Sequence, residues 1–181
     1  STEGPSGSAS ARHATTRRAQ ATLCRFASSQ PTQIRARAAV RRLRPFAVQF
    51  LDPAPLPLIR HLKSAPPPLE VWQSVHLPQA GEGADVDRFR RAVDGFLEAG
   101  VDALLFDTVA VIGGKTKFGG TGRTSDWGLV RKLMDAAGRS LPVWLAGGIH
   151  PGNVARALEA VNPSGIDLCS GVEARPGIKD P

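Results

Sequence analysis

Short apolar segments alternate with helical patterns along most of this chain, and that alternation limits its fold more than any other feature. The apolar runs are Phe46–Leu51, Val71–Leu77, Ala103–Phe106, Pro142–Ala146 and Gly165–Leu168. Between them, apolar residues recur with helical spacing over approximately Pro55–Ser64, Val86–Ala99, Asp126–Ala137 and Pro151–Ala160. Strands that alternate with helices of this length pair in parallel, so the sequence predicts an α/β fold.

The loops distinguish between the two common parallel architectures, which periodicity alone does not separate. Glycines and polar residues gather directly after the predicted strands, at Thr108–Arg123, Gly147–Asn153 and Ser170–Asp180. The carboxyl ends of the strands form the face on which a (β/α)8 barrel builds its active site. The sequence therefore favours a TIM barrel over a doubly wound sheet.

Residues 1–45 differ in composition from the remainder of the 181-residue chain. They hold nine arginines and one acidic residue, whereas residues 46–181 hold 14 basic and 15 acidic side chains, so the net charge of +7 comes from the leader. An acid-poor segment rich in Arg, Ser and Ala resembles an organelle transit peptide. An out-of-frame or non-native stretch and a nucleic-acid-binding tail are the alternatives.

We predict a disordered or transit-like leader over 1–45 and a barrel domain over 46–181. The protein is then plastidial if the leader is a transit segment, and cytoplasmic otherwise.

The metal-binding and redox side chains are sparse. Two cysteines, Cys24 and Cys169, are too few for a disulfide framework or a Cys-based zinc cluster. His61 and His76 are isolated in the sequence, and single histidines are more often surface or core residues than ligands. His150 lies beside Gly147 and Gly148, where it could contact a ligand. No metal site is predicted. The longest apolar run is also too short for a membrane-spanning helix.

Asp107 is the strongest candidate for an acid or base. It follows directly after the apolar run Ala103–Phe106, at the carboxyl end of a predicted strand. A carboxyl group at that position is well placed for proton transfer, although an Asp that starts a loop often only accepts backbone hydrogen bonds.

The Gly-rich stretch Gly113–Arg123 follows Asp107 in the sequence. It is unusually long for a loop of an α/β unit and predicts a mobile lid, because its spacing does not match a P-loop.

Two glycine turns follow the last two predicted strands. Gly147 and Gly148 follow one strand, and Ser170 and Gly171 follow the other. Glycines in such turns let backbone N–H groups approach an anion closely, and the last two loops of many TIM barrels hold a phosphate. The alternative is that these glycines only make tight turns.

Several ordered motifs in the second half of the chain resemble the phosphoribosylanthranilate isomerase family. They are Asp107-Thr108, Gly119-Gly120-Thr121-Gly122-Arg123, Asp126-Trp127, Leu145-Ala146-Gly147-Gly148-Ile149, Gly165-Ile166-Asp167-Leu168-Cys169-Ser170-Gly171-Val172-Glu173, Pro176-Gly177 and Lys179-Asp180. The resemblance implies a TIM barrel that catalyses an Amadori rearrangement in tryptophan biosynthesis. N-(5-phosphoribosyl)anthranilate would become 1-(2-carboxyphenylamino)-1-deoxyribulose 5-phosphate.

The resemblance also implies roles for individual residues. Asp107 would be the general acid, and Asp167 matches a carboxylate that faces the ligand in this family. The substrate or its phosphate would be bound by Gly120, Gly122, Gly147, Gly148, Ser170 and Gly171. Neither an organic cofactor nor a metal is required. A neighbouring or fused enzyme of the tryptophan pathway is an expected partner.

Some family motifs are missing from this sequence. The family's general base is a Cys in a Lys-Ile-Cys-Gly motif on the first strand, and neither that motif nor the family's Ser-Pro-Arg motif is present. The family's Gln-Leu-His-Gly corresponds to Gln49-Phe50-Leu51-Asp52, and no closing helix follows Pro181. We therefore predict an incomplete barrel with about five of eight strands and leave the base unassigned. A non-catalytic remnant that only binds a sugar phosphate is the main alternative to an active isomerase, and a basic-tail nucleic-acid-binding protein is the second.

Overall fold

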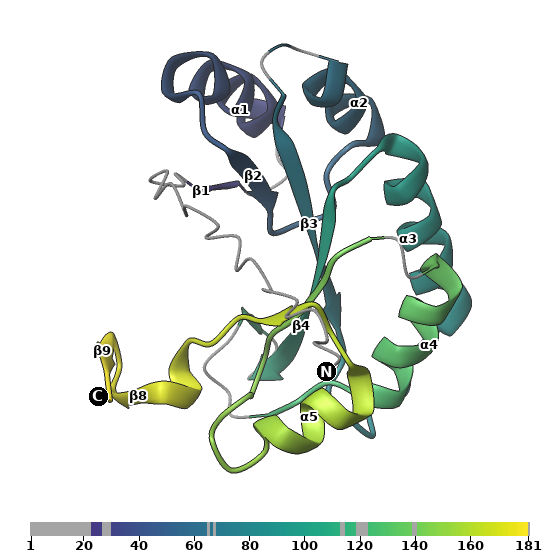
Figure 1. Cartoon of the computed structure of the whole chain (residues 1–181), viewed down its shortest axis with the longest axis vertical. Helices are drawn as coiled ribbons and strands as arrows, with labels where there is room; N and C mark the ends of the chain where they lie inside the picture. The colour runs from purple at the N-terminus through teal and green to yellow at the C-terminus, as the bar shows by residue number, and fades with distance from the viewer. Residues whose placement is uncertain are drawn as a thin grey trace, which may run out of the picture.

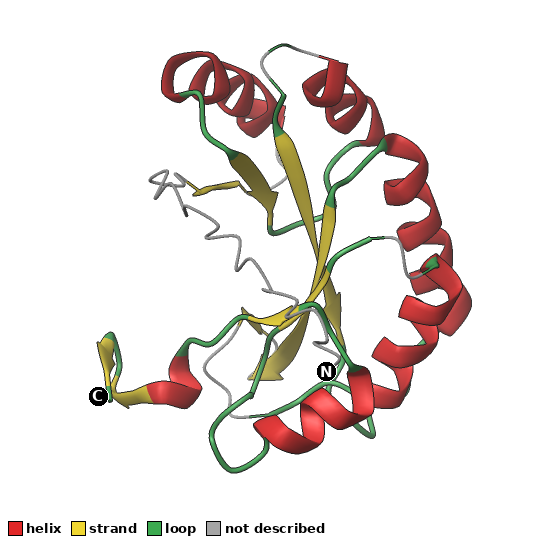
Figure 2. Cartoon of the chain, in the orientation of Figure 1, coloured by secondary structure: helices red, strands yellow, loops and turns green. Residues whose placement is uncertain are grey.

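A parallel β-sheet bent into an arc forms the body of the molecule, with helices along its convex side (Figures 1 and 2). The computed structural model describes residues 23–26, 30–64, 66, 68–112, 115–118, 123–138 and 141–180. The parallel strands are β1 (Leu23–Phe26), β2 (Ala47–Phe50), β3 (Glu70–Leu77), β4 (Ala103–Ile112), β6 (Val143–Leu145) and β7 (Gly165–Ile166). The helices are α1 (Gln30–Leu43), α2 (Leu56–Ser64), α3 (Val86–Ala99), α4 (Trp127–Ala137) and α5 (Val154–Val161).

The order of the strands identifies the type of α/β fold. The strands lie in the sheet in the order β1-β2-β3-β4-β6-β7, so each one pairs with the next parallel strand along the chain. A doubly wound sheet reverses its strand order at a switch point, whereas a TIM barrel does not. Among the described residues, β1 and β7 each have a single neighbour, so these strands form an open arc of barrel wall.

The core lies between the convex side of the sheet and the helices. Side chains from both layers are buried there in one cluster. The strands contribute Val48, Phe50, Val71, Val75, Leu77, Leu104, Phe106, Val143 and Leu145, and the helices contribute Leu58, Ile59, Leu62, Val93, Phe96, Leu129, Val130 and Leu133. Successive residues of a strand point to opposite faces. The strand residues that lie between these buried ones in the sequence therefore face the concave side of the sheet. That side carries the polar groups of the candidate site.

Short-range signals set the helix ends. Asp85 precedes α3 and its Oδ1 accepts a hydrogen bond from the Arg88 backbone N at 2.9 Å. Gly100 ends the same helix with a left-handed backbone (φ 91°), which glycine adopts without steric cost. Asp126 precedes α4 and accepts hydrogen bonds from the backbone N of Gly128 and Leu129 at 2.8 and 3.2 Å.

The first part of the chain differs from the prediction. The sequence predicts a disordered or transit-like leader over 1–45, but β1 pairs in parallel with β2, from Leu23↔Ala47 to Phe26↔Phe50, and α1 lies between the two strands in the sequence. Residues 23–50 therefore form a β/α unit of the same kind as the later ones. The described sheet has six parallel strands rather than five. The transit-like character of the residues before β1 stays a prediction.

The predicted loop after Asp107 differs as well. β4 continues to Ile112, and β5 (Lys115–Phe118) pairs antiparallel with its end, from Val109↔Phe118 to Ile112↔Lys115. Of the eleven residues of the expected lid, Gly113–Arg123, the four of Lys115–Phe118 thus form a strand. The lid residues Gly113, Gly114 and 119–122 lie outside the described part of the chain.

After β7 come a short 3-10 helix, η1 (Ser170–Val172), and a small hairpin of β8 (Glu173–Arg175) and β9 (Ile178–Lys179). No described helix has the length and apolar composition to span a membrane.

Candidate functional site

Asp107 lies at the carboxyl end of the arc, on the concave face of β4. Its strand neighbour Phe106 is fully buried under the helices, so the Asp107 side chain points to the other side and is half-buried. Asp107 Oδ1 accepts a hydrogen bond from the backbone N of Thr108 at 2.7 Å. That bond orients the carboxyl group, which lies within β4 and not at the strand end that the sequence predicted.

The neighbouring strands place three further residues level with Asp107. His76 of β3 is its register partner. On the other side, Ala146 N donates to Phe106 O at 2.8 Å and Asp167 N donates to Leu145 O at 2.9 Å, which extends both strand pairings by one residue. His76, Asp107, Ala146 and Asp167 therefore form one row across four strands. The row joins two predicted site residues, Asp107 and Asp167, and adds a histidine that sequence reasoning set aside.

The turn after β6 requires its two glycines. Gly147 and Gly148 both have a left-handed backbone (φ 82° and 66°). A Cβ on Gly147 would overlap Thr108, whose backbone N would lie 2.6 Å away, and a Cβ on Gly148 would overlap the backbone of Arg123. The turn therefore packs directly on the segments that follow β4. Asn153 secures it, because its Nδ2 donates to Gly148 O at 2.9 Å and its Oδ1 accepts from His150 N at 2.9 Å.

The loop after β7 packs on the turn after β6. A Cβ on Gly171 would overlap the carbonyl of Ile149 and would lie 3.1 Å from Cβ of His150. Ser170 and Gly171 are half-buried at the start of η1. The structure thus brings together the two glycine loops that were predicted to hold a phosphate. Gly120 and Gly122, the other predicted contacts, lie outside the described residues.

The loops after β3 and β4 are tied to each other on the other side of Asp107. Gln79 pairs with Ser125 in an isolated bridge, and Ala80 N donates to Thr124 O at 3.1 Å. Arg123 Nη1 donates to Oε1 of the buried Gln79 at 2.7 Å. These contacts anchor the carboxyl-terminal end of the predicted lid.

A pair of stacked tryptophans lies deeper on the concave face. The ring centroids of Trp72 in β3 and Trp144 in β6 are 5.7 Å apart, with 23° between the ring planes. Gly165 of β7 faces the Trp144 ring, because a Cβ there would lie 2.5 Å from Cζ3 of Trp144. Sequence reasoning missed this pair, although Trp72 and Trp144 each occupy an alternating position in a predicted strand.

Cys169 lies at the edge of the site rather than in the core. Its side chain is exposed. Lys179 of β9 donates from Nζ to the Cys169 carbonyl at 2.7 Å and to Oε1 of Glu173 at 3.1 Å. The hydrogen bond from Lys179, assisted by one from the backbone of Gly177, lowers the pKa of Glu173 below its ordinary value of 4.5.

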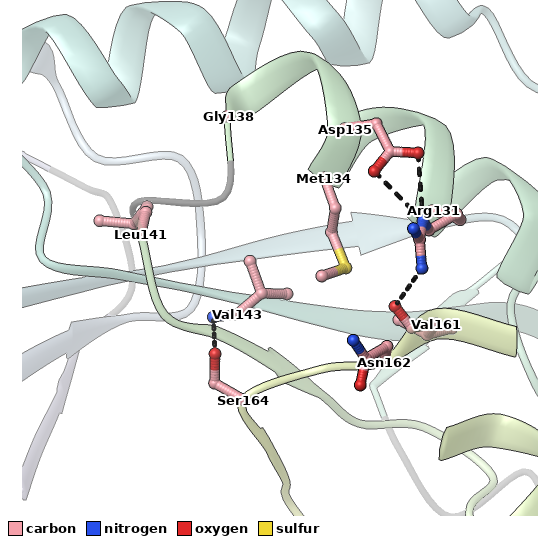
Figure 3. Close-up of a pocket in the computed structure, with 9 residues that line it drawn as sticks. All are labelled: Arg131, Met134, Asp135, Gly138, Leu141, Val143, Val161, Asn162 and Ser164. Carbon is pink, nitrogen blue, oxygen red and sulfur yellow. Dashed lines mark hydrogen bonds and ion pairs between the residues drawn. The ribbon is translucent and has the colours of Figure 1, made fainter. Parts of the chain in front are cut away.

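A hollow lies at the opposite end of the sheet, between α4 and α5 (Figure 3). Arg131 bridges its wall, because its Nε pairs with Asp135 at 3.1 Å and its Nη1 donates to Val161 O at 3.5 Å. Val143 N donates to Oγ of Ser164 at 3.1 Å at its base. Since Val143 begins β6, this hollow is at the amino end of the strands and contains no predicted site residue. No three His, Cys, Asp or Glu side chains cluster as a metal site anywhere in the described residues.

A sequential parallel arc with its polar row and glycine loops at the carboxyl ends of the strands defines a protein of the TIM-barrel type. The model of the N-(5'-phosphoribosyl)anthranilate (PRA) isomerase family matches residues 62–181. The chain belongs to the PRA isomerase family. This result confirms the resemblance and the barrel architecture predicted from the sequence.

Curated relatives carry the same family name. N-(5'-phosphoribosyl)anthranilate isomerase of Methanocella arvoryzae is 39% identical over 142 residues, which cover 78% of this chain and 60% of the relative. The Halobacterium salinarum enzyme (strain ATCC 29341) is 50% identical over 80 residues, 44% of this chain and 35% of the relative. The chain thus spans about 60% of the length of the Methanocella relative.

Solved structures superpose on the same arc. Phosphoribosyl anthranilate isomerase of Thermotoga maritima gives a TM-score of 0.63 at 26% identity, over 87% of this chain and 66% of that protein. The enzyme of Thermococcus kodakaraensis gives 0.55 at 26% identity, over 85% and 67%. Residues 46–181 make up only three quarters of this chain, so both superpositions also include part of residues 1–45.

Proposed function

We propose that this chain carries a PRA isomerase site and converts N-(5-phosphoribosyl)anthranilate to 1-(2-carboxyphenylamino)-1-deoxyribulose 5-phosphate. The observation that supports it best is Asp107, oriented by the backbone N of Thr108 on the concave face of β4 and level with the residues that directly follow β6 and β7. A related protein of the same fold was crystallised with the reduced form of this product.

The proposed chemistry needs a group that delivers a proton to the ring oxygen of the substrate. Asp107 is the proposed general acid, because the concave face removes its carboxyl group partly from water and one of its oxygens is already held by a backbone N–H. Protonation of the ring oxygen lets the bond between that oxygen and C1 break. The nitrogen lone pair of the substrate then forms a C1=N bond, and the proton on C2 becomes acidic.

The phosphate of the substrate fits the two glycine loops. Gly147 and Gly148 allow a backbone path that residues with a Cβ would block, and Gly171 allows the next loop to pack against it. Such close turns bring backbone N–H groups toward an anion. We propose Gly147, Gly148, Ser170 and Gly171 as phosphate contacts, with Gly120 and Gly122 joining from the lid and Asp167 facing the ligand from the next strand.

Turnover by the purified chain tests the proposal. Phosphoribosylanthranilate is supplied and the loss of its anthranilate-type fluorescence is followed, with Asp107→Asn and Asp135→Asn measured in parallel. Loss of the general acid lowers kcat/KM by about 10²–10⁴-fold. Asp135, exposed on α4 and paired with Arg131, is the matched carboxylate outside the site and keeps full activity. Absence of turnover in the unsubstituted chain would contradict the proposal.

A non-catalytic sugar-phosphate binder is the second candidate, because the sequence lacks the family's Lys-Ile-Cys-Gly motif. Calorimetric titration with the reduced product separates the two. Binding without turnover supports the second candidate, and binding with turnover supports the isomerase.

Partners and compartment follow from the same proposal. The partner of the site is a small phosphorylated molecule, and an enzyme of tryptophan biosynthesis is the proposed neighbour or fusion partner. Plastid import would follow if the residues before β1 act as a transit segment, and a cytoplasmic location if they do not. A fluorescent fusion of residues 1–22 distinguishes the two.

A further inference from the structure

The parallel pairing of β3 with β4 places an imidazole beside the proposed general acid. The pairing extends from Trp72↔Ala103 to Leu77↔Thr108, and His76 is the register partner of Asp107 within it. Cα partners on adjacent parallel strands lie about 4.8 Å apart, so side chains on the same face of such a pair are immediate neighbours. The two groups come from positions 31 residues apart in the sequence.

The side chains of His76 and Asp107 share the concave face. Val75 and Leu77, on either side of His76, belong to the core under the helices, as does Phe106 beside Asp107. The alternation of a strand therefore directs His76 and Asp107 to the opposite side. Both ring nitrogens of His76 are shielded from solvent. The imidazole thus lies in the low-water part of the site, where proton transfer with bulk water is hindered.

We propose that His76 is the general base that removes the C2 proton of the substrate, an inference that rests on the proposed function. In the ring form of the substrate, the ring oxygen and C2 are both bonded to C1. Two groups about 5 Å apart on neighbouring strands can therefore reach these two atoms from one side. Imidazole suits the task because its ordinary protonation equilibrium lies near neutral pH.

The proton transfers balance over the cycle. Asp107 gives its proton to the ring oxygen as the C1–O bond breaks and C1=N forms. His76 then takes the proton from C2, whose electron pair forms C1=C2 while the C1=N electrons return to nitrogen. In the last step the imidazolium of His76 gives its proton to C1, and the carboxylate of Asp107 takes the proton of the 2-hydroxyl as the ketone forms. Both residues regain their starting states and no oxidant or reductant is consumed.

The test compares the unsubstituted chain with His76→Gln, and with His61→Gln as the matched histidine exposed on α2. Substrate with deuterium at C2 is used beside ordinary substrate, and calorimetry with the reduced product measures binding. We expect His76→Gln to lower kcat/KM by about 10²–10⁴-fold and to increase the isotope effect, because C2–H removal becomes rate-limiting. Affinity for the reduced product and the thermal midpoint stay close to those of the unsubstituted chain, and His61→Gln changes nothing.

Several outcomes would overturn the proposal. His76→Gln that retains turnover within about twofold would show that the base lies elsewhere. A fall in turnover with an equal fall in affinity and an unchanged isotope effect would show a structural role. If His76→Gln does not fold, His76→Ala with added imidazole replaces it, and failure of imidazole to restore turnover contradicts a base. An inactive unsubstituted chain would remove the proposed function itself, whereas an active chain with an insensitive His76 removes only this inference.

Discussion

Gly147 shows at the residue scale how the site depends on one missing side chain. Its backbone is left-handed, and a Cβ would overlap Thr108, which orients the Asp107 carboxyl group. We predict that Gly147→Ala lowers the free energy of unfolding by about 2–4 kcal/mol, since it combines backbone strain with overpacking. Gly81→Ala is the matched control, because Gly81 has a similar φ of +89° with nothing within 4 Å of the added Cβ. Urea unfolding measures both, and equal losses would contradict the prediction.

Glu173 carries a prediction about acid at the same scale. Its pKa is lowered chiefly by the hydrogen bond from Lys179. A carboxyl group with a lowered folded-state pKa stabilises the fold above its unfolded value of about 4.5, and that contribution disappears as the pH falls through the folded value. We predict that Lys179→Met raises the pKa of Glu173 and weakens the acid dependence of unfolding. NMR titration of the carboxyl carbon checks it, with the exposed Lys132→Met as control.

At the scale of elements, Asp102, directly before β4, joins β3 to α2 at the amino end of the sheet. One oxygen accepts from the backbone N of Val71 in β3 at 2.7 Å, and both oxygens lie 2.7 Å from Nζ of Lys63 in α2. We predict that Asp102→Ala costs about 1–3 kcal/mol of unfolding free energy, because the partly buried N–H of Val71 loses its acceptor and the Lys63 ammonium keeps only its bond to the Leu69 carbonyl. Asp94→Ala, which removes an exposed pair with Arg90 at 4.0 Å, costs less than about 0.5 kcal/mol. Thermal unfolding compares the two, and a similar cost for both would rule out this role of Asp102.

Sequence patterns predict elements well where the information is local, and less well where it is not. The apolar spacing predicts α3 with the bounds Val86–Ala99 that the structure has, whereas Asp107, which was predicted at the end of its strand, lies within β4, because that strand continues to Ile112. β1 was missed because its four residues become a strand only by pairing with β2. His76 was set aside for the same reason, since its neighbour Asp107 is brought to it by strand register, which one sequence does not reveal.

At the scale of the whole molecule, the tryptophan pair reports the curvature of the arc. Trp72 and Trp144 belong to strands separated by β4, about 9.6 Å apart in a flat sheet, yet their ring centroids are 5.7 Å apart. Bending of the sheet toward its concave side brings the rings together. We predict an exciton couplet in the circular dichroism spectrum that Trp72→Phe and Trp144→Phe each abolish. Trp127→Phe, on α4, leaves it unchanged, and a couplet that survives loss of either strand tryptophan would contradict the stacking.

The sequential strand order also bears on how the chain acquires its structure during synthesis. Each strand finds its partner in the β/α unit made just before it, so a segment leaving the ribosome can add to an existing edge without waiting for a distant part of the chain. Pairing between successive units keeps contact order low for a parallel sheet and shortens the time during which apolar strands are exposed. The wall of the barrel can therefore assemble from its amino-terminal edge at the pace of translation.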